Sequence, residues 1–202
     1  MECTLPRCVV LLLLAVAVPP VFADTDLAAA IASNAIDIRF FGTGGSSGDS
    51  IVAKVRLRET YGGTSLDISV APGTQLLSGR AGEQNMVISR LRGRMTNAVQ
   101  FEVARTIRAT RSEQTFVFEA FCLDMELDNP AATTVLSVGT VDPILTCIVE
   151  KGGTTLQTQA AIWYLRSGTS QAHFNSKFDG GGLDKTQWAH AVAIATACAA
   201  TK

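Results

Sequence analysis

The chain has 202 residues, of which 47% are hydrophobic, 17% are charged and 6% are aromatic, and its formal net charge is −1. This apolar content excludes an intrinsically disordered chain. The 17 glycines lack the strict period of collagen, and no sustained heptad pattern indicates a coiled coil. We therefore expect one globular domain that buries a core of its own.

The first 23 residues have the features of a secretory signal peptide. An unbroken apolar run covers residues 9–18, and Val21 and Ala23 place small residues where a signal peptidase cleaves. The run is too short to span a bilayer, which takes about 20 residues. We expect cleavage after Ala23, a single β-rich domain over residues 24–202 with no membrane span, and a secreted or periplasmic location.

The first part of that domain shows a β pattern. A short helix is predicted at 26–35, behind an aspartate cap. Apolar and polar residues then alternate, or form short apolar runs, in six predicted strands at 36–40, 51–58, 66–70, 98–107, 115–123 and 144–149. Turn signals such as Gly62–Gly63 and Asn129–Pro130 separate them. Six to nine strands at about this spacing predict an antiparallel β-sandwich or barrel.

The end of the chain has a helical period. Residues 154–166 predict a helix, residues 168–182 a loop, and an alanine-rich helix is expected from Leu183 or Asp184 to about Ala200. The predicted fold class is therefore α+β, with an antiparallel sandwich-like or barrel-like domain and carboxy-terminal helices.

Three cysteines lie outside the predicted leader: Cys122, Cys147 and Cys198. An odd number in an oxidising compartment allows at most one disulfide and leaves one sulfur over. The chain has no Cys-x-x-Cys pair and only two histidines, which argues against a zinc site. We expect no metal and no cofactor.

One glutamine of the predicted helix at 154–166 lies on its apolar face. At 100° per residue, Gln159 shares that face with Leu156, Ile162 and Trp163. A buried amide without partners costs about 1–3 kcal/mol. Gln157 points the other way and fits a capping box with the threonine three residues before it. Gln159 has no such local role, so it is a candidate for chemistry.

A cysteine thiol and a glutamine amide held together in a dry pocket can react. The thiol adds to the amide carbon, ammonia leaves and an internal thioester forms, because proximity makes this acyl transfer feasible. Two strings resemble motifs of the thioester domains of bacterial surface adhesins. Phe121-Cys122-Leu123 is similar to the aromatic–Cys–hydrophobic motif, and Thr158-Gln159-Ala160-Ala161-Ile162-Trp163 is similar to the TQxA(I/V)W motif.

The resemblance implies a β-rich body with a helical portion and an adhesion function. Cys122 would be the thiol partner and Gln159 the acyl partner, and four residues would shield the bond: Phe121, Leu156, Ile162 and Trp163. The protein would attach covalently to an amine-bearing surface protein in a single-use reaction, without turnover. The chain departs from the family in the spacing, since only 37 residues separate Cys122 from Gln159 and no hydrophobic–Gln–hydrophobic motif lies between them.

The disulfide has two possible pairings. If Cys122 reacts with Gln159, Cys147 and Cys198 remain as a pair that would tie the last helix to the sheet. The alternative is a Cys122–Cys147 disulfide between strands, with Cys198 as a small buried thiol.

A second candidate function is non-covalent binding. Seven arginines and no lysines lie between residues 80 and 111, against two glutamates. Arg90, Arg92 and Arg94 would share one face of a strand and could contact an acidic glycan or an acidic protein, because arginine binds such groups bidentately. The alternative is an ordinary solvated β face. We expect no nucleic-acid partner, since the chain has few aromatic residues on which bases could stack.

A cysteine hydrolase is the third reading, with Cys122 as nucleophile and His173 or His190 as base. Catalytic cysteines usually lie at a helix amino terminus, where the thiol pKa is lowered. Cys122 is predicted in a strand, so we expect that the protein is not an enzyme.

Overall fold

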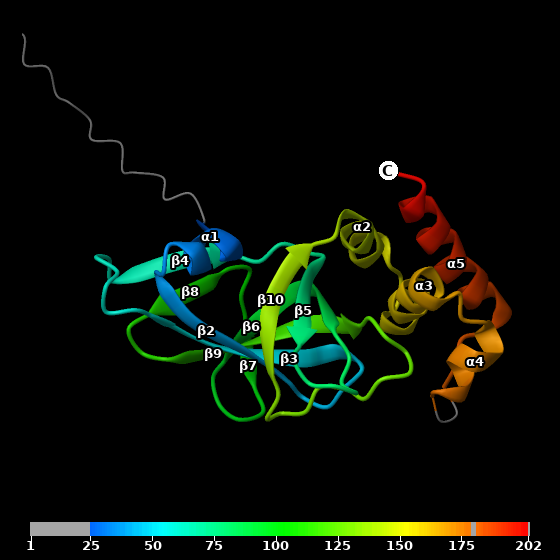
Figure 1. Cartoon of the computed structure of the whole chain (residues 1–202), viewed down its shortest axis with the longest axis horizontal. Helices are drawn as coiled ribbons and strands as arrows, with labels where there is room; N and C mark the ends of the chain where they lie inside the picture. The colour runs from blue at the N-terminus through cyan, green and yellow to red at the C-terminus, as the bar shows by residue number, and fades with distance from the viewer. Residues whose placement is uncertain (1–24, 179–180, 202) are drawn as a thin grey trace, which may run out of the picture.

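The computed structural model describes residues 25–178 and 181–201 (Figure 1), so the predicted signal peptide lies outside the described residues. The strands are β1 (Thr25–Asp26), β2 (Ile36–Gly42), β3 (Ser47–Leu57), β4 (Ser65–Ser69), β5 (Thr74–Ser78), β6 (Met86–Met95), β7 (Phe101–Val103), β8 (Ile107–Thr110), β9 (Gln114–Cys122) and β10 (Val135–Val141). The helices are α1 (Leu27–Ala32), α2 (Pro143–Lys151), α3 (Thr155–Ser167), α4 (Gln171–Ser176) and α5 (Lys185–Ala199).

Six antiparallel strands close into a barrel. Their order is β5-β10-β2-β3-β9-β6, and pairing of β6 with β5 completes the circle, while β7 extends from β6. A second, three-stranded sheet has the order β1-β4-β8, in which β1 runs parallel to β4. The predicted α+β class is therefore confirmed, with a barrel-like sheet and carboxy-terminal helices.

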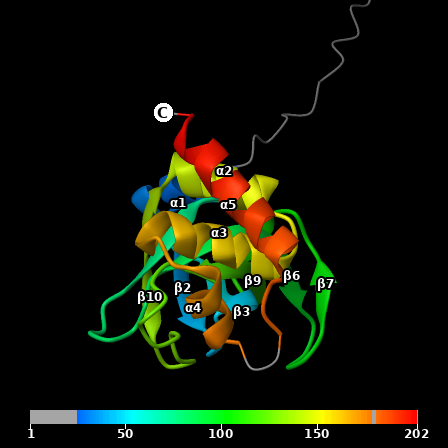
Figure 2. The same cartoon turned by 90° about the vertical axis from the view of Figure 1, so that its right-hand side faces the viewer.

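The helices from α2 to α5 form a layer at one end of the barrel. Figure 1 shows them on the side opposite α1 and β4, and Figure 2 views this layer from outside. No helix among the described residues is long and apolar enough to cross a membrane. Buried residues of the barrel and of the helices form one continuous core, which includes Phe40, Phe118, Ile148 and Phe174.

Helix starts follow the local signals in the sequence. Asp26 caps α1, as predicted, and Asp184, one of the two residues at which the last helix is expected to begin, caps α5. Thr154 and Gln157 make the expected capping box of α3, since each side chain binds the backbone N–H of the other residue. These caps satisfy amide groups that a helix terminus leaves free.

The prediction of a strand at 144–149 is wrong, because these residues form helix α2. The Asp142 carboxylate accepts hydrogen bonds from the amides of Ile144 and Leu145, and Pro143 occupies the first turn, where its missing N–H is not needed. A short apolar run does not distinguish a buried strand from a buried helix. The helix start signal formed by Asp142 and Pro143 distinguishes the two and indicates a helix.

Two other expected segments differ from the structure. The strand predicted at 98–107 is not continuous: residues 98–100 belong to the turn that joins β6 to β7, and residues 104–106 separate β7 from β8, which belong to different sheets. The loop predicted at 168–182 contains helix α4, capped by Ser170 and packed on the core through Phe174. Both errors arise from local patterns too short to define an element alone.

The disulfide joins Cys147 to Cys198, with a Cα–Cα distance of 5.6 Å. This confirms the pairing that leaves Cys122 free. The bridge ties α5 to α2 rather than to the sheet, because Cys147 lies in a helix. The disulfide therefore fastens together two members of the helical layer.

Candidate functional site

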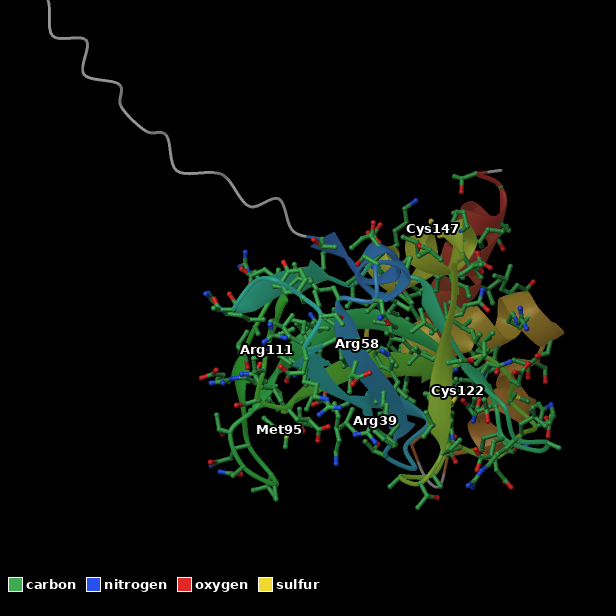
Figure 3. All side chains as sticks on the ribbon, turned by 60° about the vertical axis from the view of Figure 1, so that its left-hand side comes forward. Arg39, Arg58, Met95, Arg111, Cys122 and Cys147 are labelled. Atoms are coloured by element: carbon green, nitrogen blue, oxygen red, sulfur yellow. A yellow bond between two sulfur atoms is a disulfide. The ribbon has the colours of Figure 1, made fainter. Side chains whose placement is uncertain are left out.

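The site lies where strand β9 ends beneath helix α3. Strand β9 pairs with β3 and β6 and is buried along most of its length, and Cys122 is its last residue. Gln159 lies in the second turn of α3, among residues that are buried against the barrel. Figure 3 places Cys122 on the helix-bearing side of the barrel, away from Arg39, Arg58 and Arg111.

Cys122 and Gln159, the two residues that the resemblance pairs, are in direct contact through the Cys122 backbone. The Gln159 Oε1 atom accepts a hydrogen bond from the Cys122 backbone N–H at 3.0 Å, and Gln159 Nε2 donates to the Cys122 carbonyl oxygen at 2.8 Å. Both residues are completely buried. The Gln159 amide is thus held flat against the backbone of the residue that bears the thiol.

The Cys122 sulfur has two close neighbours. Its Sγ lies 3.3 Å from Asn129 Oδ1 and 3.6 Å from Met86 Sδ. Burial raises the pKa of the Cys122 thiol, and the negative charge of Asp124 raises this pKa further. The sulfur is therefore a neutral thiol in the folded protein, unlike the thiolate of a cysteine hydrolase.

The four residues expected to shield the pair are all in or against the core. Phe121, Ile162 and Trp163 are buried, and Leu156 is partly buried against them. Trp163 packs edge-on against Phe174, with ring centroids 5.6 Å apart. Cys122 is part of the same apolar core, and Gln159 is completely buried beside it.

A surface pocket of about 570 Å³ lies beside the end of β9 and the first turns of α3. Its lining includes Phe121 and Thr158, which directly precede Cys122 and Gln159, together with the loop before α3. Glu119 and Glu150 add carboxylates to the pocket, and Arg90 adds one guanidinium. The pocket brings solvent within one residue of each member of the pair.

Sequence reasoning missed two neighbours of the Cys122 sulfur, Met86 and Asn129, and also Gln84, which binds Asn129. Asn129 precedes a proline, so the local signal is that of a turn. Gln84 precedes β6 in a connecting segment. Nothing in the local sequence of either residue indicates a place at the site, because it is the pairing of β6 with β9, with Met86 opposite Cys122, that brings these segments together.

The three arginines proposed as a polyanion contact are already paired with carboxylates. Arg90 Nε lies 2.7 Å from Glu119 and Arg94 Nη2 lies 2.6 Å from Glu102. Arg92 lies between Asp49 at 3.5 Å and Glu119 at 3.8 Å. An acidic ligand would have to compete with these internal partners.

The histidines lie elsewhere. His173 Nε2 pairs with Glu126 at 3.1 Å, and neither His173 nor His190 is a hydrogen-bond partner of Cys122. Within residues 25–178 and 181–201, no group of three or more His, Cys, Asp or Glu side chains could hold a metal ion. Comparison of the chain with protein-family models, curated proteins and solved structures found no match.

Proposed function

We propose that Cys122 and Gln159 form an internal thioester, through which the secreted protein attaches covalently to an amine-bearing surface partner. The observation that carries the proposal is the two-point contact between the Gln159 amide and the Cys122 backbone. This is the chemistry that the resemblance to thioester domains of adhesins implies.

The first step of the proposed reaction joins Cys122 to Gln159. The Cys122 sulfur attacks the side-chain carbonyl carbon of Gln159, the carbon–nitrogen bond breaks, and the thiol proton leaves with the nitrogen as ammonia. The Cys122 N–H, 3.0 Å from Oε1, would stabilise the negative charge that develops on this oxygen. The reaction converts a thiol and an amide into a thioester and ammonia, so it needs no oxidant and no cofactor.

Burial accounts for storage of the product. A thioester is hydrolysed by water, and the apolar residues around the fully buried pair exclude water from it. The pocket beside Phe121 and Thr158 offers one approach for an amine from outside. A small movement of α3 would then expose the carbonyl carbon.

The second step attaches the partner. A primary amine attacks the thioester carbon, the carbon–sulfur bond breaks, and a proton from the amine restores the Cys122 thiol. The product is an amide bond between the partner and Gln159. Because the original amide nitrogen has been lost, the reaction occurs once for each molecule and does not constitute turnover.

The intact mass of the secreted protein tests this proposal, with variants Cys122→Ala and Gln159→Ala. Gln157→Ala is the matched control, because Gln157 lies on the same helix and contacts the cap rather than Cys122. We expect the wild type and Gln157→Ala to be short by one ammonia, and the other two variants to have the full mass. Methylamine should add to Gln159 and free one thiol at Cys122.

A full mass for the wild type would contradict the thioester. The non-covalent reading would then have to be tested by binding to a sulfated polysaccharide such as heparin, with Arg90, Arg92 and Arg94 replaced by alanine. Binding that falls steeply with salt and is lost in this variant would support an acidic partner.

A further inference from the structure

The sulfur of Cys122 contacts Asn129, and Asn129 forms a hydrogen bond with Gln84. The two residues lie in different loops. Asn129 lies between β9 and β10, and Gln84 lies between β5 and β6. The loops are tied together, since the Gln84 amide N–H donates to the Asp128 carbonyl at 2.9 Å. The Gln84 side chain is almost completely buried, with 2% exposure.

The Asn129 side chain is held in one orientation by three contacts. Its Nδ2 donates to the Gly44 carbonyl at 3.0 Å, and its Oδ1 accepts from Gln84 Nε2 at 2.6 Å. The same Oδ1 lies 3.3 Å from the Cys122 sulfur. Turning the amide over would place its N–H groups against Gln84 Nε2, so the oxygen must be the atom that faces the thiol.

Gln84 is oriented just as firmly. Its Nε2 donates to both Asn129 Oδ1 and the Leu127 carbonyl, at 2.6 Å and 3.3 Å. Rotation of the amide would set Oε1 against these two acceptors. In the described structure the Gln84 Oε1 atom has no hydrogen-bond partner, so the orientation is retained although one buried acceptor is left unpaired, which costs free energy.

We propose that Asn129, held by Gln84, is a positioning residue for the thiol that attacks Gln159; this inference rests on the proposed thioester. A thiol has one hydrogen, and the amide oxygen is a stronger acceptor than the Met86 thioether. The S–H bond therefore points to Asn129, which leaves the sulfur lone pairs free on its other sides. Asn129 is not a base, because the proton leaves with ammonia.

The first test is the rate of bond formation during refolding of the chain, followed by intact mass in the wild type and in Asn129→Ala. We expect about a tenfold slower loss of ammonia in Asn129→Ala. Asn129→Asp keeps an acceptor oxygen beside the sulfur and should recover part of the rate. Asn97→Ala is the matched control, because Asn97 also binds backbone amides in a turn but lies between β6 and β7.

The second test reads the hydrogen bond itself and does not require the thioester. In a Gln159→Ala background the thiol stays free, and the infrared S–H stretching band is isolated by subtracting the spectrum of the same chain with Cys122→Ser. We expect Asn129→Ala to shift this band to higher frequency, as for an S–H group without an acceptor. Asn97→Ala should leave it in place.

The outcomes separate the two proposals. Suppose that the wild type has its full mass and that the S–H band shifts in Asn129→Ala. This result would refute the thioester, and with it the role of Asn129 in forming it, but it would support the hydrogen bond between Cys122 and Asn129. A wild type that loses ammonia equally fast with and without Asn129, or a band that does not move in Asn129→Ala, would overturn the positioning role. Equal circular dichroism spectra of the variants exclude misfolding as the cause.

Discussion

The Gln159 side chain, on helix α3, binds both the backbone N–H and the backbone carbonyl of Cys122, 37 positions earlier, and the same N–H also donates to the Ser46 carbonyl. A buried glutamine normally needs several partners, and here both polar atoms of its amide are satisfied by one residue. The same two bonds join α3 to β9, so the contact stabilises the fold whether or not the proposed thioester forms. The effect of this contact on stability can be measured separately from the proposed reaction, in variants in which the thioester cannot form.

Loss of the Gln159 amide should destabilise the fold even without a thioester. In a Cys122→Ala background the backbone contacts persist but no bond can form. In this background, Gln159→Ala should lower the free energy of unfolding by about 1–3 kcal/mol, because the buried backbone carbonyl of residue 122 loses its hydrogen-bond donor. Gln157→Ala, which removes one side of a capping box, should cost about 1 kcal/mol or less. Urea unfolding measures both, and equal losses would contradict this account.

The free thiol should make stability depend on pH. Because the pKa of Cys122 is raised in the fold, the unfolded chain releases its proton first as the pH rises. The stabilising contribution is therefore complete below the ordinary thiol pKa of about 9 and declines above it. Gln159→Ala should lose up to about 1.4 kcal/mol per pH unit in that range relative to Gln159→Ala with Cys122→Ala. Parallel pH profiles of urea unfolding would refute the prediction.

The disulfide should contribute strongly to stability because it closes a long loop. Cys147 and Cys198 are 51 positions apart, and a bridge of this length is worth about 2–4 kcal/mol. We expect the Cys147→Ala, Cys198→Ala double variant to lose that amount in urea unfolding and to be unaffected by added reductant, whereas Cys122→Ala, which keeps the bridge, should lose stability when reductant is added. A double variant as stable as the wild type would show that the helical layer does not depend on the bridge.

Glu119 should matter more than the arginines that surround it. Its carboxylate is buried and accepts from Ser89, Arg90 and Arg92, whereas the Arg90 side chain is 62% exposed. Glu119→Gln should cost about 1–3 kcal/mol, since the guanidinium groups lose a charged acceptor. Arg90→Ala should cost less than about 1 kcal/mol. Thermal unfolding compares the two, and the opposite ranking would show that the arginine provides the stability.

Local signals in the sequence predicted a large part of this protein. Alternation of apolar and polar residues predicted β2, β3 and β9 of the barrel and β4 of the second sheet, and side-chain caps predicted the starts of α1 and α3. The apolar position of Gln159 on its helix, beside the string that resembles a thioester motif, singled it out before any contact was visible. These features depend on neighbours in the chain, so a single sequence carries them.

The tertiary structure decided what local patterns could not. The run 144–149 is a helix because of its cap and its packing on the core, and so the disulfide joins two helices. Asn129 contacts the Cys122 sulfur and is bound by Gln84 because the pairing of β6 with β9 brings the loop before β6 next to the loop after β9. Contacts between distant segments depend on strand order and register, and the periodicity of each segment taken separately does not specify either of them.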